Sequence, residues 1–357
     1  MTREEAWMQL TSAGCVSGDL PEPVVSNPWY VKVMLAFSGW LASLFLFAFF
    51  GAAFSSLLDE PSFCLVLGLG LNAGAYAVFR KQPSDFIEHL GLALSLAGQG
   101  LVAFAVADSL AIDEASTWLV AALYEAALLV LMPNSIHRVF SSVLSLLALG
   151  VAMVMVHLTW LFDAALLGMT AVCGLNVFTW PSQIERLQAA LYGLVITLIL
   201  FYGIAHFDPF LLQYWANRNV SPDELQALMQ RRWLIWGAEV LTLGYVAWML
   251  GRRAGLSVSS GAARVMMVGV VLAAAVAWQI DGLIVGMLVL ILGYSQSHRL
   301  IMALGIVVLL TFTSSYYYSL SSTLLAKSGY LLAMGGGLLG VRWIMNRFLD
   351  KEEAPHA

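Results

Sequence analysis

Two apolar runs that follow each other almost without a break decide the fold: VFSSVLSLLALGVAMVMVH at residues 139–157 and WLFDAALLGMTAVCGLNVFTW at residues 160–180. Each has the roughly 20 mostly apolar residues that a helix needs to cross a hydrocarbon core about 30 Å thick. Because only Leu158 and Thr159 separate the runs, we predict two membrane-spanning helices that run antiparallel.

Runs of this kind fill nearly the whole chain after Val31. The 357 residues are 60% hydrophobic and 11% charged, with a mean hydropathy of +0.82, whereas soluble domains average about 25% charged residues. This composition excludes an ordinary water-soluble enzyme and most nucleic-acid binders. The sequence predicts an all-α, polytopic transmembrane helix bundle of about 12 spans, at 33–55, 62–79, 87–107, 116–132, 139–157, 160–180, 187–205, 233–250, 263–279, 282–294, 300–316 and 322–346. The run at 282–294 is short for a span, so eleven spans or a re-entrant piece are the alternatives.

The charges favour one orientation of the bundle. The chain has 17 basic and 22 acidic residues, a net charge of −5, and the basic residues collect at alternate loops. Short cytoplasmic loops accumulate Lys and Arg, so we expect both termini in the cytoplasm. The basic side carries Arg3, Lys32, Arg80, Lys81, Arg138, Arg186, Arg252, Arg253, Arg264, Arg299, Arg342, Arg347 and Lys351, and the other side carries Arg218, Arg231, Arg232 and Lys327.

The expected organisation has three parts. Residues 1–27 form a short cytoplasmic N-terminal amphipathic segment, in which Thr2 and Glu5 make a capping-box pattern for a helix that ends near Gly14. Residues 28–347 form the transmembrane domain, with one long outer loop at 206–232, and residues 348–357 form a cytoplasmic tail.

Three ionisable residues within the predicted spans make a candidate intramembrane polar site: Glu125, Glu239 and Lys327. A charge at the centre of a spanning helix costs roughly 2.5 to 3.5 kcal/mol, so each needs a partner or a wet cavity. We expect all three in the outer half of the membrane. In the functional interpretation Lys327 pairs with one glutamate and the other carries a proton. In the structural alternative Lys327 reaches outward to the headgroups and the glutamates hydrogen-bond within the bundle.

A second candidate site lies at the outer interface of the predicted membrane. Its members are three aromatic residues of the type found at headgroup depth and three ionisable residues near helix ends: Tyr316, Tyr317, Tyr318, His157, Asp163 and Asp281. Their spacing matches no zinc motif, and the cysteines at 15, 64 and 173 are far apart, so no metal is expected.

Motifs for other chemistry do not occur in the chain. There is no Walker motif, GxSxG elbow or HExxH pattern, so neither a catalytic residue nor a cofactor is predicted. Gly70 and Gly74 form a GxxxG pair, which indicates close helix packing within the bundle. The neutral Asn72 and Gln99 are assigned to helix packing.

Two stretches carry a family resemblance. The first is PWYVK at 28–32 leading into LAFSGWL at 35–41, and the second is SYYYSL at 315–320 followed by TLLAKSG at 323–329. They resemble an uncharacterised family of bacterial polytopic inner-membrane proteins, a domain of unknown function often encoded beside a small membrane protein with a GDYxxLxY motif. The resemblance covers about Pro28 to Arg347. It implies a bacterial inner-membrane location and a membrane-embedded partner, and it brings no activity.

Two functions from different classes therefore stand open. One is a secondary-transporter-like permease with a polar site in the outer half of the bilayer. The other is a non-catalytic subunit or assembly partner of an inner-membrane complex, in which the GDYxxLxY protein and the lipid bilayer are the expected partners.

Overall fold

The computed structural model is built from helices, and no strand occurs among the residues that it describes. These are residues 3–20, 28–53, 59–81, 84–109, 113–207, 232–257 and 259–319, with single positions between 325 and 340. The helices are α1 (Arg3–Ser12), α2 (Trp29–Ala53), α4 (Pro61–Phe79), α5 (Asp85–Ser109), α6 (Glu114–Leu131), α7 (Ser135–Met155), α8 (Thr159–Asn176), α9 (Ile184–Phe207), α12 (Arg232–Arg253), α13 (Gly261–Ala277), α14 (Leu283–Ser295) and α15 (Arg299–Ser319), with 3-10 turns at Val177–Thr179 and Pro181–Gln183.

Eight of the described helices are long and apolar enough to cross a membrane, namely α4 to α9, α12 and α15. The chain is thus a multi-pass membrane protein, as predicted. The helices from α2 to α15 coincide with the first eleven predicted runs. The twelfth run, at 322–346, and most of the outer loop, at 208–231, lie outside the described residues, so the number of spans stays a prediction.

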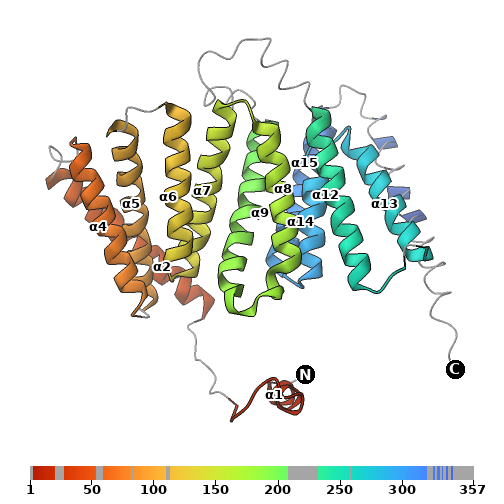
Figure 1. Cartoon of the computed structure of the whole chain (residues 1–357), viewed down its shortest axis with the longest axis horizontal. Coiled ribbons are helices and arrows are strands. Elements are labelled where there is room, and N and C mark those ends of the chain that lie inside the picture. Colours follow the sequence, from red (N-terminus) through yellow and green to blue (C-terminus); the bar gives the residue numbers. More distant parts are fainter. Residues whose placement is uncertain are drawn as a thin grey trace.

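The helices stand side by side in a row, α4, α5, α6, α7, α9, α8, α12 and α13 (Figure 1). α2 packs on α5, and α14 with α15 packs behind α8 and α12. The chain order is broken once, because α9 lies between α7 and α8. Gly193 of α9 permits this contact, since a Cβ at that position would overlap the Ser142 side chain of α7.

Helices begin and end at Pro, Asn and Gly residues of the sequence. Pro61 lies in the first turn of α4, Asn134 caps α7, and Gly282 adopts a left-handed φ of 76° before α14. At the N-terminus α1 matches the predicted short helix, and Gly14 follows it with a φ of 68°. These positions have the residue types that helix ends favour.

α14 is 13 residues long, or about 20 Å, which is shorter than a hydrocarbon core. Five of its side chains are nevertheless fully buried: Ile284, Val285, Leu288, Val289 and Leu292 are all 0% exposed. All but Ile284 belong to the main apolar cluster with residues of α8 and α9, and Ile284 packs with residues of α12 and α13. α14 is therefore a central packing element rather than a lipid-facing one.

Basic residues gather at one edge of the row. Successive helices run antiparallel, so the α4–α5, α6–α7, α8–α9 and α12–α13 connections share the lower edge in Figure 1. Arg80, Lys81, Arg186, Arg252 and Arg253 lie at these connections, whereas Arg232 begins α12 at the opposite edge. We call the edge that carries the α4–α5, α6–α7, α8–α9 and α12–α13 connections the basic edge.

The Gly70–Gly74 face does not pack as expected. A Cβ at either glycine would meet none of the described atoms within 4 Å, whereas a Cβ at Gly68 would lie 2.7 Å from the Gly98 carbonyl oxygen of α5. The close α4–α5 contact therefore uses Gly68 and Gly98, and the GxxxG face lies open on the described part of the protein.

Asp113 caps α6 outside the membrane-spanning segment, and its cap is pH-dependent. Its carboxylate accepts hydrogen bonds from the Ser116 amide (3.0 Å) and hydroxyl (2.8 Å), which lower the pKa of Asp113. A lowered folded-state pKa stabilises the protein above the ordinary value of about 4, and this stabilisation is lost as the pH falls through the folded value. We expect Asp113→Ala to lower the melting temperature at pH 7 and to have a progressively smaller effect as the pH falls through the folded-state pKa of Asp113. An effect of the same size at pH 7 and in acid would contradict this account, and Asp113→Asn, which retains an acceptor, is the control.

Candidate functional site

Six buried polar side chains from four neighbouring helices meet inside the apolar bundle. Each is at most 7% exposed, so together they form a polar interior within a largely apolar surround. We call them the α4–α7 polar cluster: Asn72 of α4, Ser95 and Gln99 of α5, Glu125 of α6, and His137 and Ser141 of α7.

The start of α7 places two of these residues. The Asn134 side chain accepts a hydrogen bond from the His137 amide at 2.8 Å, which fixes the first turn after Pro133. His137 and Ser141 are four residues apart and therefore share one face. This face points toward Ser95 and Gln99 of α5 and Glu125 of α6.

Hydrogen bonds join the cluster into a chain. Asn72 donates to the Gly68 carbonyl (2.9 Å), which leaves its Oδ1 to accept from the Ser95 hydroxyl (2.6 Å). Ser95 Oγ lies 2.7 Å from His137 Nε2, and Ser141 Oγ lies 3.4 Å from His137 Nδ1. The Ser141 side chain also lies close to the Glu125 carboxyl.

This chain selects one tautomer of His137. The single Ser95 proton goes to Asn72, so the 2.7 Å contact requires a proton on His137 Nε2. The Gln99 group 3.0 Å from Nε2 must then be the carbonyl oxygen, and an amide flip supplies it. The flip moves Gln99 Nε2 away from His137 and Ser141, into the buried position that Oε1 otherwise occupies without a partner. His137 Nδ1 is then free to accept from Ser141.

The tautomer can be observed directly. In protein labelled with nitrogen-15 histidine and reconstituted in lipid, solid-state NMR should show the neutral His137 ring protonated on Nε2. The His137→Gln variant assigns the signal by its loss. A neutral ring protonated on Nδ1 would contradict the hydrogen-bond order described above.

Glu125 ends the chain with an unused acceptor. Its Oε2 is buried and has no hydrogen-bond partner among the described residues. The neighbouring Ala122 is also buried, and Ser145 of α7 donates to the Ala122 carbonyl at 2.8 Å. The close α6–α7 contact therefore encloses the carboxyl in protein and keeps it from lipid.

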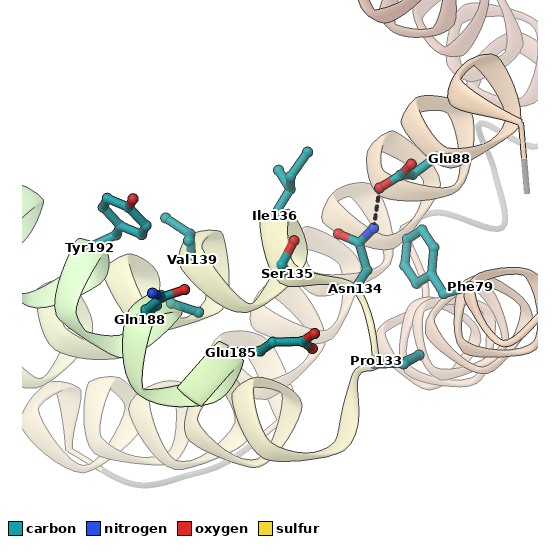
Figure 2. A pocket seen from close by; sticks show the side chains of 11 residues that line it. Phe79, Glu88, Pro133, Asn134, Ser135, Ile136, Val139, Glu185, Gln188 and Tyr192 are labelled. Carbon is teal, nitrogen blue, oxygen red and sulfur yellow. Dashed lines mark hydrogen bonds between the residues drawn. The ribbon is translucent and has the colours of Figure 1, made fainter. Parts of the chain in front are cut away.

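A cavity of about 630 Å³ lies beside the cluster at the basic edge. Figure 2 shows Glu88 and Asn134 pointing toward each other on one side, with Asn134 Nδ2 donating to Glu88 Oε1 at 2.5 Å, and Glu185 nearby. The lining residues are Phe79, Glu88, Pro133, Asn134, Ser135, Ile136, Val139, Glu185, Gln188, Ala189 and Tyr192. This volume falls in the range of small-molecule sites.

Phe79 separates the cavity from the cluster. Its side chain lines the cavity, and its ring packs edge-on against the His137 ring with centroids 6.0 Å apart. Arg138, the next residue of α7, turns away from the cluster, because its Nε donates to the Met132 carbonyl at 2.6 Å and its Nη1 lies 3.9 Å from Glu185. One aromatic ring thus lies between the cavity and His137.

A second buried cluster, the α8–α12 polar cluster, contains Asp163 of α8, Tyr202 of α9 and Glu239 of α12. Asp163 is 8% exposed and Glu239 is 5% exposed. Both carboxyl groups interact electrostatically with the Tyr202 hydroxyl, and Glu239 is close enough to act as its hydrogen-bond partner. The Tyr202 hydroxyl makes no well-aligned hydrogen bond to a described residue. The Glu239 carboxyl therefore lies near the hydroxyl without forming a hydrogen bond to it.

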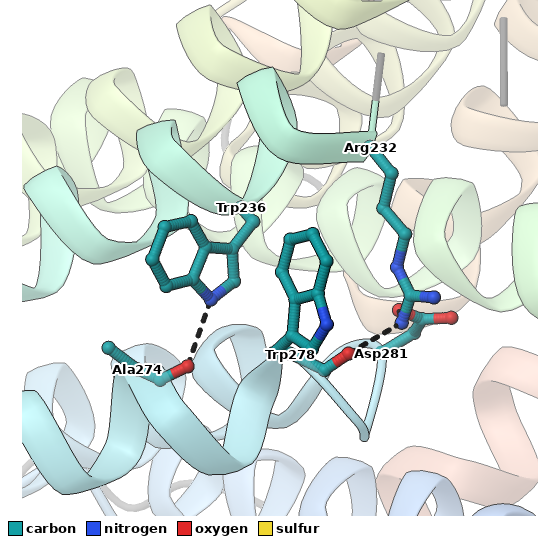
Figure 3. A network of polar contacts seen from close by, with 5 residues as sticks. All are labelled: Arg232, Trp236, Ala274, Trp278 and Asp281. Carbon is teal, nitrogen blue, oxygen red and sulfur yellow. Dashed lines mark hydrogen bonds and ion pairs between the residues drawn. The ribbon is translucent and has the colours of Figure 1, made fainter. Parts of the chain in front are cut away.

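A set of aromatic and charged contacts joins the start of α12 to the end of α13 (Figure 3). Arg232 binds Asp281 at 2.6 Å and donates to the Trp278 carbonyl at 3.0 Å. Trp236 donates to the Ala274 carbonyl at 2.9 Å and packs edge-on against Trp278. Since Arg232 and Asp281 are both exposed, these contacts hold α12 to α13 and form no buried site.

The predicted intramembrane residues do not meet. Glu125 lies past the middle of α6, on the half toward the basic edge, whereas Glu239 lies two turns from the start of α12 near the opposite edge. α6 packs on α7, and α12 packs on α8 and α13. The two glutamates therefore lie toward opposite edges of the row, and their depth in a membrane stays a prediction. Lys327 lies outside the described residues.

The predicted outer-interface residues are scattered. His157 is in the α7–α8 turn with a left-handed φ of 59°, Asp163 is buried, and Asp281 pairs with Arg232. Tyr316 packs against the main apolar cluster, and Tyr317 and Tyr318 contact each other at the end of α15. Within the described part of the chain no group of three or more His, Cys, Asp or Glu side chains could hold a metal ion.

The sequence-based search missed His137, Ser95 and Ser141. It began the α7 run at Val139, after the charged Arg138, and so assigned His137 to a loop. Pro133 followed by Asn134 is a helix-start signal, and using it would have placed His137 and Ser141 on one helical face.

Comparison with known proteins supplies the family. The model of a family described as "Domain of unknown function (DUF4401)" matches residues 28–348. No curated protein and no solved structure matches the chain. The match confirms the predicted membership in an uncharacterised family, over nearly the range that carried the resemblance.

Proposed function

We infer the function from the site itself, because the chain belongs to DUF4401, a family described as a domain of unknown function. We propose a secondary-transporter-like permease of the bacterial inner membrane. The basic edge supports an orientation in which the α4–α5, α6–α7 and α8–α9 connections lie in the cytoplasm. In this orientation the cavity opens to the cytoplasm.

One observation carries the proposal: the cavity is backed by the α4–α7 polar cluster, so polar groups extend from the basic edge to Glu125 inside an apolar bundle. Polar groups within a membrane are costly, and they mark solute or ion pathways when they do not serve packing alone. The lining contains two carboxyl groups, Glu88 and Glu185, and no Lys or Arg. This favours a small cationic solute.

Solute-evoked currents test the proposal. Protein in liposomes on a solid-supported membrane should give a transient current when a protonated amine is added, and not when a neutral sugar is added. Glu88→Gln should raise the half-saturating concentration about tenfold, the loss of one charge-assisted contact. Glu114→Gln, which removes an exposed carboxyl from α6, should leave the current unchanged. Folded protein that responds to no solute class, at either face, would contradict the permease.

The open Gly70–Gly74 face favours a second candidate, a non-catalytic subunit of a membrane complex. Small-residue faces support close helix contact, and the described residues leave this one uncovered. A membrane partner of the GDYxxLxY type is the expected occupant. Purification from native membranes in mild detergent should then yield a partner in fixed ratio, and Gly70→Leu should release it. A solitary, monodisperse particle would reject this alternative.

A further inference from the structure

We propose that the α4–α7 polar cluster is a proton-transfer chain, in which a proton passes between the Glu125 carboxyl and His137 through the Ser141 hydroxyl. The inference rests on the proposed function in one respect, because it makes H⁺ the coupling ion of the permease. The chain of contacts itself does not depend on the solute.

The first argument is the incomplete bonding of Glu125. A purely structural carboxyl would be expected to use both oxygens, because a buried polar atom without a partner costs about 1 to 3 kcal/mol. Glu125 is 7% exposed, yet its Oε2 has no partner among the described residues. A carboxyl with one unpaired oxygen can take up a proton there without breaking a hydrogen bond.

The second argument is the order of the hydrogen bonds. With Nε2 of His137 protonated, Nδ1 accepts from Ser141, and Ser141 Oγ can accept from a protonated Glu125. Every donor in the series from Glu125 through Ser141, His137 and Ser95 to Asn72 then points the same way. A chain with one donor direction can shift a proton by concerted transfer.

The transfer from Glu125 to His137 needs no further reactant, and water accepts the proton in the last step. Glu125 gives its proton to Ser141 Oγ while Ser141 gives its own hydroxyl proton to His137 Nδ1. The products are a Glu125 carboxylate, an unchanged serine and a His137 imidazolium. The imidazolium then loses its Nε2 proton to a water molecule from the cavity, when the Phe79 ring moves aside, and the neutral ring carries its proton on Nδ1 until the hydrogen bonds reset.

Few other charges act on Glu125. The titratable and charged groups on the elements packed against it are Glu114 and Tyr124 on α6, His137 and Arg138 on α7, Asp85, Glu88, His89 and Asp108 on α5, and Glu185, Arg186, Tyr192, Tyr202 and His206 on α9. Arg138 is bound to Met132 and lies near Glu185, and Glu88, Glu185 and Tyr192 face the cavity. Glu125 and His137 are therefore the pair that exchanges the proton.

Proton uptake without solute tests the chain. Liposomes that contain a pH-sensitive dye are given a potassium diffusion potential, negative inside, with valinomycin. Wild type and Glu114→Gln should acidify the interior, whereas Glu125→Gln should match protein-free liposomes. Ser141→Ala should lose uptake and Ser141→Thr, which restores the hydroxyl, should regain it. Wild-type uptake by a correctly folded Glu125→Gln would overturn the proposal.

A spectroscopic readout covers the case in which a variant fails to fold. In pH-difference infrared spectra, wild type and Glu114→Gln should show the C=O band of a protonated carboxyl, and folded Glu125→Gln should lack it. If solute-evoked currents occur without proton uptake or pH dependence, the chain is rejected and the permease stands. If proton uptake requires Glu125 but no solute evokes a current, the chain stands and the permease is rejected.

Discussion

Replacing His137 with leucine is expected to lower the stability of the bundle more than loss of any exposed charge. His137 is 0% exposed and connects Ser95, Gln99 and Ser141. Three hydrogen bonds of the average strength in membrane proteins contribute about 2 kcal/mol together, and the cost rises by about 1 to 3 kcal/mol for each polar group left buried without a partner. The melting temperature in detergent should fall by several degrees.

His89 is the matched control for this variant. It lies on α5, near the same end of the bundle, and its Nδ1 is buried without a hydrogen-bond partner among the described residues. His89→Leu should therefore change stability much less than His137→Leu. Equal losses would mean that the α4–α7 polar cluster does not hold these helices together.

Gly193→Ala is expected to separate α7 from α9. A Cβ at Gly193 would overlap both Oγ and Cβ of Ser142, and because a rotamer change does not move Cβ, it does not relieve the contact. Overpacking of this kind costs about 1 to 3 kcal/mol. The substitution gains up to about 1 kcal/mol of helix propensity, so the net loss should be measurable as a lower midpoint in denaturant.

Two further variants serve as a control and a rescue for this prediction. Gly203 lies on the same helix and a Cβ there would meet nothing within 4 Å, so Gly203→Ala should leave stability unchanged or raise it. Adding Ser142→Gly to Gly193→Ala should restore most of the loss, because it removes the overlapping side chain. A Gly193→Ala protein as stable as Gly203→Ala would show that α9 does not approach α7 closely.

The sequence predicts the helices well because length and apolarity are local properties. A spanning helix satisfies all its backbone hydrogen bonds within one segment, so the runs could be placed without knowing their neighbours. The ends at Pro61, Asn134 and Gly282 follow from the same local chemistry. The class of membrane protein and the family could be predicted from the sequence for this reason.

Which helices pack against each other could not be predicted in the same way. Nothing local places α9 between α7 and α8, since that contact depends on Gly193 meeting Ser142, more than 50 residues apart in the chain. Glu125 and Glu239 were chosen as site residues because both lie inside predicted spans. Their depth in the membrane does not decide which helices contact each other. The two residues consequently fell in separate clusters. Asn72 and Gln99, near Glu125, had been assigned to packing, and Asp163, near Glu239, had been assigned to the outer interface.

Water access to the α4–α7 polar cluster tests the central claim most directly. Ser141→Cys in liposomes is exposed to a small, membrane-impermeant thiol reagent, with Leu288→Cys in the 0% exposed centre of α14 as the control, both in a background without the native cysteines. The account predicts that Ser141→Cys reacts, that Phe79→Ala accelerates the reaction, and that Leu288→Cys stays unreactive. If Ser141→Cys remains as unreactive as Leu288→Cys, even with Phe79→Ala, the cluster is sealed packing and the proposed path does not exist.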